Sequence, residues 1–177
     1  MTDHPRASVA ITVAIIGFMG AIGGALIDRD KAPPPIEDIS EIHTPKVKSV
    51  VQRAINLGAD AYWNLDTSSL EKIFKDEAIN LLRESVVSKK NQGIKIKNQS
   101  KEINFYNIDF QVDPLKAKVR FSRKLRTLSY SLENKHCIES TPEYSQEMTY
   151  YLQYYENGWK VVAIELHNSP PQERELC

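Results

Sequence analysis

Residues 150–166 read YYLQYYENGWKVVAIEL, and this stretch decides the fold. Apolar and aromatic side chains alternate with polar ones on both sides of Asn157-Gly158, a pattern typical of half-buried β-strands. Asn-Gly is the dipeptide that a two-residue hairpin turn prefers, because both of its residues tolerate a positive φ. We therefore expect strands over residues 148–155 and 159–166, joined as an antiparallel hairpin.

Two further strands are predicted upstream of this hairpin. Ile103 and Phe105 alternate with polar residues within residues 102–112, and residues 116–131 form a second, longer alternating run. Asp113-Pro114 between the two runs marks a turn. The second half of the chain therefore predicts a series of antiparallel strands.

The residues before these strands follow a helical period. Thr44 can cap a helix whose first position is Pro45, where the missing N–H costs nothing. Ser68 followed by Glu71 is a capping-box pattern and predicts a second helix start. A third helical segment covers residues 76–90. Helices followed by strands predict an α+β domain with two to three helices packed on a curved antiparallel sheet.

A resemblance to a known fold rests on the residues of the strands: Tyr144, Tyr150, Leu152, Tyr154, Gly158-Trp159-Lys160 and Lys118-Val119-Arg120. These resemble the cone-shaped fold of the nuclear-transport-factor-2-like superfamily over about residues 46–166. Within it, the chain is most similar to the intermembrane-space domain of chloroplast-division J-domain-like proteins and their cyanobacterial relatives. A membrane-anchored domain of this shape also resembles assembly factors of type IV secretion systems. Both resemblances imply contact with other proteins rather than catalysis.

The N-terminal region predicts a membrane anchor. Residues 8–27 contain 20 consecutive uncharged residues, which as a helix span the ~30 Å hydrocarbon core of a bilayer. A cleavable signal peptide is the alternative, because Ala21, Gly23, Gly24 and Ala25 offer small residues near a cleavage point. Lys and Arg counts favour a cytoplasmic domain by a narrow margin, whereas the short N-terminal tail favours the opposite. We expect a single-pass protein with its domain on the extracytoplasmic side.

Small residues follow one face of this predicted membrane helix. Such residues let two helix backbones approach closely in lipid, and Gly20 and Gly24 also form a GxxxG pair. The alternative is that Gly and Ala are simply frequent in membrane helices. The pattern predicts a homodimer associated through Ala10, Ala14, Gly17, Gly20, Ala21 and Gly24.

These predictions divide the chain into five parts. Residues 1–7 are a short tail and residues 8–27 the membrane helix. Residues 28–44, with Pro33-Pro34-Pro35, are a semi-rigid linker. Residues 45–166 are the α+β domain, in which residues 132–145 are a loop, and residues 167–177 are a flexible tail.

Composition excludes several classes of protein. The 177 residues carry a formal net charge of zero, whereas a general nucleic-acid-binding protein shows a basic excess. Cys137 and Cys177 can form one disulfide in an oxidising compartment, or remain free thiols. The sequence contains no phosphate-binding loop, dinucleotide fingerprint or nucleophile elbow, and we expect no cofactor.

The residues that could support catalysis do not form a recognisable pattern. Enzymes of the resembled superfamily place Asp, His or Tyr inside the cone, where the candidates are Asp60, Tyr62, Asp66 and His136. Nothing in their spacing pairs them as acid and base, and Asp66 fits a turn. The four histidines show no metal-ligand spacing and are expected on the surface or in linkers: His4, His43, His136 and His167.

The predicted strand at residues 116–131 carries a row of cations. They all occupy even positions and therefore share one face of the sheet. The simpler interpretation is a solvated face whose Lys and Arg discourage edge pairing. The alternative is a docking surface for an acidic protein segment or anionic lipid headgroups. We refer to these residues as the basic stripe: Lys116, Lys118, Arg120, Lys124 and Arg126.

Together these features predict a membrane-anchored, non-catalytic interaction or scaffold domain with a protein partner. One alternative is a cone that binds a small molecule or catalyses a reaction, which would need an apolar pocket with converging polar groups. Another is a subunit of a type IV secretion-like envelope complex.

Overall fold

Helix α1 (Ile36–Asn64) opens the part of the chain that the structure, a computed structural model, describes, namely residues 36–177. The helix begins earlier than the start expected at Thr44-Pro45, inside the range assigned to the linker, so Pro45 lies within it. A proline in a helix removes one backbone hydrogen bond. The turns before Pro45 are held by tertiary contacts instead: Ile39 is buried, and Trp159 Nε1 donates to His43 Nδ1 at 3.2 Å.

The segment after α1 is a single 3₁₀ turn, η1 (Leu70–Lys72), rather than a second α-helix. The expected capping box is absent because Ser68 donates its backbone N–H and its hydroxyl to the Asp66 carboxylate, at 2.9 and 3.0 Å. Asp66 is therefore the turn residue that the sequence suggested. Helix α2 (Asp76–Asn91) confirms the third predicted helical segment.

The second half of the chain forms one antiparallel sheet. The order of hydrogen-bonded strands is β5-β4-β2-β3-β6. Strands β4 and β3 pair with successive parts of β2, and β1 pairs with β2 along its whole length, on the opposite edge. The strands are β1 (Ile94–Gln111), β2 (Lys116–Ser131), β3 (Cys137–Ser140), β4 (Tyr144–Tyr155), β5 (Gly158–Leu166) and β6 (Glu175–Leu176). The strand at 116–131 and the hairpin are confirmed. The turn residues are Glu156 and Asn157, because Tyr155 pairs with Gly158, which opens β5 and has the positive φ of +103°.

Three parts of the sheet differ from the expectation. Strand β1 begins at Ile94 rather than near residue 102. Strand β3 and the start of β4, at Tyr144 rather than 148, lie inside the predicted loop. The predicted flexible tail contains β6, which pairs with β3. Its start is also held to the sheet, because His167 N–H donates to the Glu147 carbonyl at 3.0 Å.

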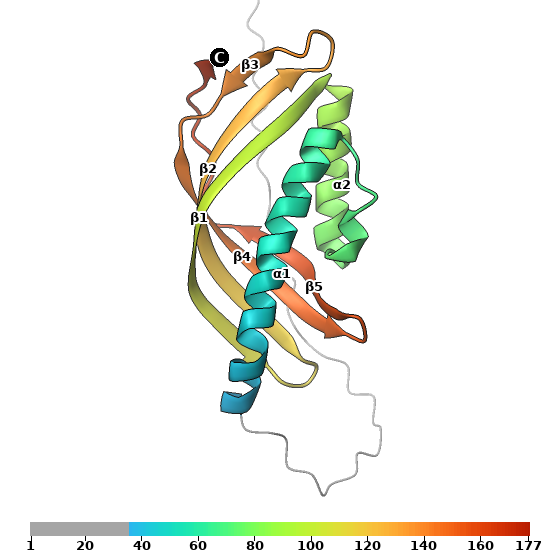
Figure 1. Ribbon diagram of the computed structural model, residues 1–177, viewed down its shortest axis with the longest axis vertical. Coiled ribbons are helices and arrows are strands. Elements are labelled where there is room, and N and C mark those ends of the chain that lie inside the picture. Colours follow the sequence, from blue (N-terminus) through green and yellow to red (C-terminus); the bar gives the residue numbers. More distant parts are fainter. Residues whose placement is uncertain (1–35) are drawn as a thin grey trace, which may run out of the picture. The chain divides into compact units, whose positions relative to one another are not determined.

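Helices α1 and α2 pack against one face of the curved sheet (Figure 1). The core between the two layers is continuous from the helices to β2, β4 and β5. Its largest fully buried side chains include Phe74, Phe121, Leu152, Val51 and Val161. Burial of apolar surface of this kind is the dominant stabilising contribution to folding. The expected α+β class, with helices on an antiparallel sheet, is thereby confirmed.

Within residues 36–177, no helix is both long and apolar enough to cross a bilayer. The predicted membrane helix at residues 8–27 and its row of small residues lie outside the described residues.

Candidate functional site

The basic stripe lies on the face of the sheet opposite the helices, which we call the outer face. Along β2, odd positions such as Val119 and Phe121 are buried, while Lys118, Arg120, Lys124 and the other stripe residues are at least partly exposed. This is the alternation that a regular strand imposes. The structure therefore brings the whole predicted stripe onto one surface.

Carboxylates from other strands of the sheet offset much of the stripe's charge. Arg120 Nη2 lies 3.2 Å from Glu147, Lys124 Nζ lies 2.6 Å from Glu102, and Arg126 Nη2 lies 3.5 Å from Glu175. All six side chains are substantially exposed, so solvent screens each pair and it contributes little to stability. The hydrogen bond that Lys124 donates to Glu102 raises the pKa of Lys124, and the negative charge of Glu102 raises it further.

Lys118 differs from these three stripe residues. It makes no ion pair with the described residues, and its Nζ lies 5.8 Å from the ring centroid of Tyr151. Asp109 is its register partner on β1, but the carboxylate of Asp109 accepts a hydrogen bond from Asn107 Nδ2 at 2.8 Å. Lys118 is therefore a cation on the outer face that an incoming carboxylate could bind.

Lys118 and Arg120 line an open depression of about 460 Å³ on the outer face. Strand β1 contributes Tyr106, Asn107 and Asp109, and β4 contributes Glu147. Two cations, two carboxylates, an amide and a phenol make a polar lining, unlike the mostly apolar pockets that hold small molecules. This lining is suited to a polar segment of another protein.

Tyr106 reaches the outer face because of a β-bulge. Phe105 pairs with Phe121 and Asn107 pairs with Arg120, so Tyr106 is the extra residue between them. The bulge keeps Phe105 packed against the core while Tyr106 turns outward, where it is 57% exposed. Its hydroxyl donates to Ser122 Oγ at 2.7 Å, which explains why Ser122 is buried at an even position of β2.

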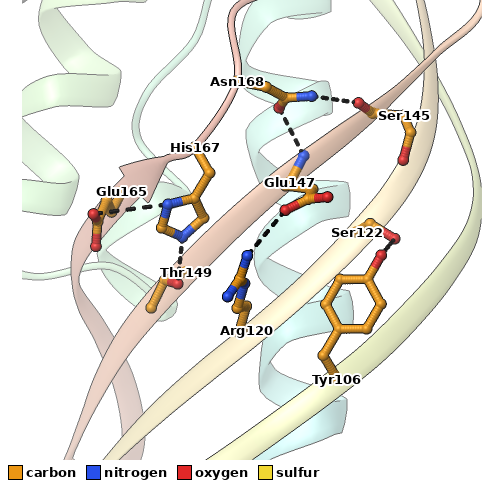
Figure 2. A network of polar contacts seen from close by, with 9 residues as sticks. All are labelled: Tyr106, Arg120, Ser122, Ser145, Glu147, Thr149, Glu165, His167 and Asn168. Atoms are coloured by element: carbon orange, nitrogen blue, oxygen red, sulfur yellow. Dashed lines mark hydrogen bonds and ion pairs between the residues drawn. The ribbon is translucent and has the colours of Figure 1, made fainter.

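Residues just beyond β5 brace the rim of the depression (Figure 2). Asn168 Oδ1 accepts the backbone N–H of Glu147 at 2.8 Å, and Asn168 Nδ2 donates to the Ser145 carbonyl at 2.7 Å. The His167 ring bonds Thr149 through Nε2 at 2.7 Å and lies 3.8 Å from Glu165 through Nδ1. These contacts fix the end of β4 from which Glu147 reaches Arg120.

The candidate catalytic residues do not converge. Asp66 closes a turn with Ser68, and Tyr62 Oη donates to Ser85 Oγ at 2.7 Å between the two helices. Asp60 and His136 are exposed. Within residues 36–177, no group of three or more His, Cys, Asp and Glu side chains could hold a metal ion.

Two features were missed at the sequence level. His43 was expected on the surface or in a linker, but its ring packs edge-on against Tyr154 and Trp159. Burial lowers the pKa of His43, and the nearby Lys46 ammonium lowers it further. Arg123 projects to the helix-facing side and donates to Gln146 Oε1. Alternation places Arg123 on that side, but no pattern identifies its partner.

Cys137, at the start of β3, and Cys177, just after β6, form a disulfide with their Cα atoms 5.6 Å apart. The bond encloses the chain between β3 and the C-terminus. It joins the last described residue to the sheet.

Comparison with known proteins gives a fold but no family. No known family and no curated protein matches the sequence. Among solved structures, the chain is similar to the intermembrane space region of the chloroplast protein ARC6, with a TM-score of 0.62 and 11% identity over 71% of this chain and 96% of that one. It is also similar to a periplasmic fragment of TraM, with a TM-score of 0.50 and 14% identity over 71% and 98%.

At these identities the similarity concerns the fold alone. The predicted resemblance to a chloroplast intermembrane-space domain is confirmed at that level. Membership of the nuclear-transport-factor-2-like superfamily stays a prediction.

Proposed function

We propose that this chain is a membrane-tethered, non-catalytic interaction domain on the extracytoplasmic side of its membrane. Its outer sheet face captures an extended acidic segment of a partner protein. In this arrangement a partner carboxylate pairs with Lys118, and an apolar or aromatic partner side chain packs on Tyr106. The observation that carries the proposal is the open depression, in which an exposed tyrosine lies beside a lysine without an ion pair among the described residues.

The chemistry of the depression supports a protein partner. Tyrosine is enriched among the residues that dominate binding energy at protein interfaces, because its ring is large and its hydroxyl tolerates solvent. Tyr106 is held in place through Ser122, so little side-chain entropy is lost when a partner packs on it. Charge pairs at such a surface mainly set specificity and association rate.

Two observations support the extracytoplasmic side. The disulfide between Cys137 and Cys177 is a bond that persists in oxidising compartments and is rare in the cytosol. The fold is shared with an intermembrane space region and with a periplasmic fragment. A reporter that is active only outside the cytoplasm, fused after Cys177, should be active. Activity of a cytoplasmic reporter instead would contradict this part of the proposal.

The membrane anchor and its association belong to the same proposal. The uncharged run at residues 8–27 is long enough to span a bilayer. Its small residues would let two copies associate, which would present two outer faces to a partner. Replacing Gly20 and Gly24 by Leu should then reduce cross-linked dimer in membranes.

Site-specific photo-cross-linking in the native membrane tests the docking face. A benzophenone amino acid at Tyr106 should yield one discrete protein adduct. The matched control is the same residue at Leu81, which is half exposed on α2 and should give no such adduct. No adduct from position 106, or the same adduct from both positions, would refute the outer face as the docking surface. Cross-linking to lipid alone would favour anionic headgroups instead.

A further inference from the structure

The helix-facing side of the sheet contains an arginine without an acidic partner. Arg123 is partly buried, yet none of the ion pairs among residues 36–177 includes it. Its Nε and Nη2 both donate to Gln146 Oε1, at 2.9 and 2.7 Å. A guanidinium presents five N–H donors in a planar fork. The edge formed by Nη1 and Nη2 therefore has no acceptor within the described chain.

Gln146 holds this guanidinium in a fixed orientation. Gln146 is 7% exposed and is the register partner of Arg123 on β4, so the two side chains lie side by side on one sheet face. Two hydrogen bonds to one oxygen fix the plane of the guanidinium. Its unoccupied edge is thereby preorganised for a planar, bidentate acceptor such as a carboxylate.

Two tyrosine hydroxyls lie on the same face with no hydrogen bond of their own. Tyr144 lies two residues before Gln146 on β4, and Tyr150 lies four residues after it, beyond Met148. Neither hydroxyl bonds a described residue. Ser100 Oγ is the only buried side-chain polar atom among residues 36–177 that lacks a hydrogen bond. Tyr144 is half-buried, whereas Tyr150 is 4% exposed and packs edge-on against Phe121 in the core.

Arg123 acts electrostatically on the tyrosines around it. Burial raises the pKa of Tyr144 and of Tyr150, and the positive charge of Arg123 partly offsets the rise in each. The same holds for Tyr62 on α1, where the hydrogen bond to Ser85 also lowers the pKa. All three phenols thus lie within the field of one guanidinium.

An apolar surface borders these polar groups. Strand β5 ends where Leu166 pairs with Met148, which places both side chains on the helix-facing side. Met148 is buried, whereas Leu166 is 47% exposed. Beyond Leu166, His167 and Asn168 continue along β4 through hydrogen bonds to Glu147 and Ser145. Gln146 lies two residues before Met148 on the same face of β4.

We propose that Arg123, held by Gln146 with Tyr144 beside it, binds the carboxylate of a ligand whose apolar body packs against Leu166. The carboxylate accepts two hydrogen bonds from Nη1 and Nη2 and a third from a tyrosine hydroxyl. This site lies on the opposite side of the sheet from the outer-face depression and is independent of the proposed partner docking.

The test is ligand-observed ¹⁹F NMR of 4-fluorobenzoate with the full-length chain in detergent micelles. 4-Fluorobenzamide has the same shape without the charge and corrects for partition into micelles. The wild type should bind the benzoate about tenfold or more tightly than the amide, because charge-assisted hydrogen bonds are about twice as strong as neutral ones. Arg123→Gln should abolish this preference. Equal binding of the two probes by the wild type, or no binding, would overturn the proposal.

Lys124→Gln is the matched control variant. It removes one positive charge from the neighbouring position of β2, on the outer face, and should leave benzoate binding unchanged. Circular dichroism establishes whether Arg123→Gln folds. If Arg123→Gln does not fold, Tyr144→Phe provides the test. This variant removes only a hydroxyl without a partner and should weaken benzoate binding severalfold. Full benzoate binding by Arg123→Gln, or an equal loss in Lys124→Gln, would refute the site.

Discussion

Strand β2 carries cations on both of its faces, and the two faces satisfy them differently. On the outer face, Arg120, Lys124 and Arg126 each reach a carboxylate on another strand. On the helix-facing side, Arg123 is more buried and reaches only the neutral amide of Gln146. The more buried cation thus has the weaker electrostatic compensation.

This difference separates two roles for charge in the domain. Surface ion pairs keep the outer face soluble and contribute little to stability. A partly buried cation that lacks a counter-ion costs desolvation energy, and a ligand that supplies the negative charge would offset that cost. The predictions below test each side of this comparison.

The largest expected effect concerns the buried positions between these cations. Phe121→Ala removes a fully buried ring from the core and should lower the free energy of unfolding by about 3–5 kcal/mol. Arg120→Ala, one residue away on the outer face, should cost less than about 1 kcal/mol. Urea denaturation of both variants measures the contrast. Similar losses from the two variants would mean that the two faces are not buried as described.

A smaller effect is expected from separating Arg123 and Gln146. Arg123→Met leaves the buried Gln146 carbonyl oxygen without its donor, which should cost about 1–3 kcal/mol. The double variant Arg123→Met, Gln146→Leu removes both partners and should recover most of that loss. A double-mutant cycle from urea denaturation gives the coupling energy. Additive losses would show that the two side chains do not depend on each other.

The ion pairs on the outer face should contribute least to the stability of the domain. Arg120→Gln is expected to change the free energy of unfolding by less than about 1 kcal/mol, because both members of the pair with Glu147 are substantially exposed. The change should shrink further as salt is raised. Denaturation in low and high salt provides the measurement, and a loss of several kcal/mol that salt does not affect would contradict the surface character of the stripe.

A pH-dependent effect is expected at the start of α1. Burial and Lys46 lower the pKa of His43 below its usual 6.5, so the folded state favours the neutral ring that accepts from Trp159. The contribution of His43 to the free energy of unfolding is present above its pKa in the unfolded state and is lost as pH falls through its pKa in the folded state. Thermal stability should therefore drop on acidification below neutral pH, and less in His43→Gln than in wild type. His136→Gln, at an exposed site, should behave as wild type.

The helices and strands that were predicted correctly are those whose own residues show a clear apolar pattern or turn signal. Strand β2 was placed at its observed bounds because Ala117, Val119, Phe121 and Leu125 recur at alternating positions. The hairpin was placed from Asn157-Gly158, and Gly158 has the positive φ. The same alternation put the stripe on the outer face. These are local properties of the chain.

Elements that depend on tertiary contacts were missed. The first turns of α1 rest on His43 and Trp159, which are 116 residues apart, so Pro45 was taken as a start rather than an interior position. Strand β3 is short and is held by β2 and β6. The first half of β1 has few buried side chains and relies on its pairing with β2. The partners of Arg123 and Tyr106 likewise follow from register, which the sequence does not encode locally.

The most direct test of the central claim compares Lys118→Glu with Lys124→Glu. Both reverse a charge on the outer face of β2, but Lys124 lies six residues away and already pairs with Glu102. With the photo-cross-linker at Tyr106, we expect Lys118→Glu to eliminate the partner adduct and Lys124→Glu to retain it, while both variants keep the circular dichroism spectrum of the wild type. An adduct that survives in Lys118→Glu, or is lost equally in both variants, would contradict a docking site at the depression.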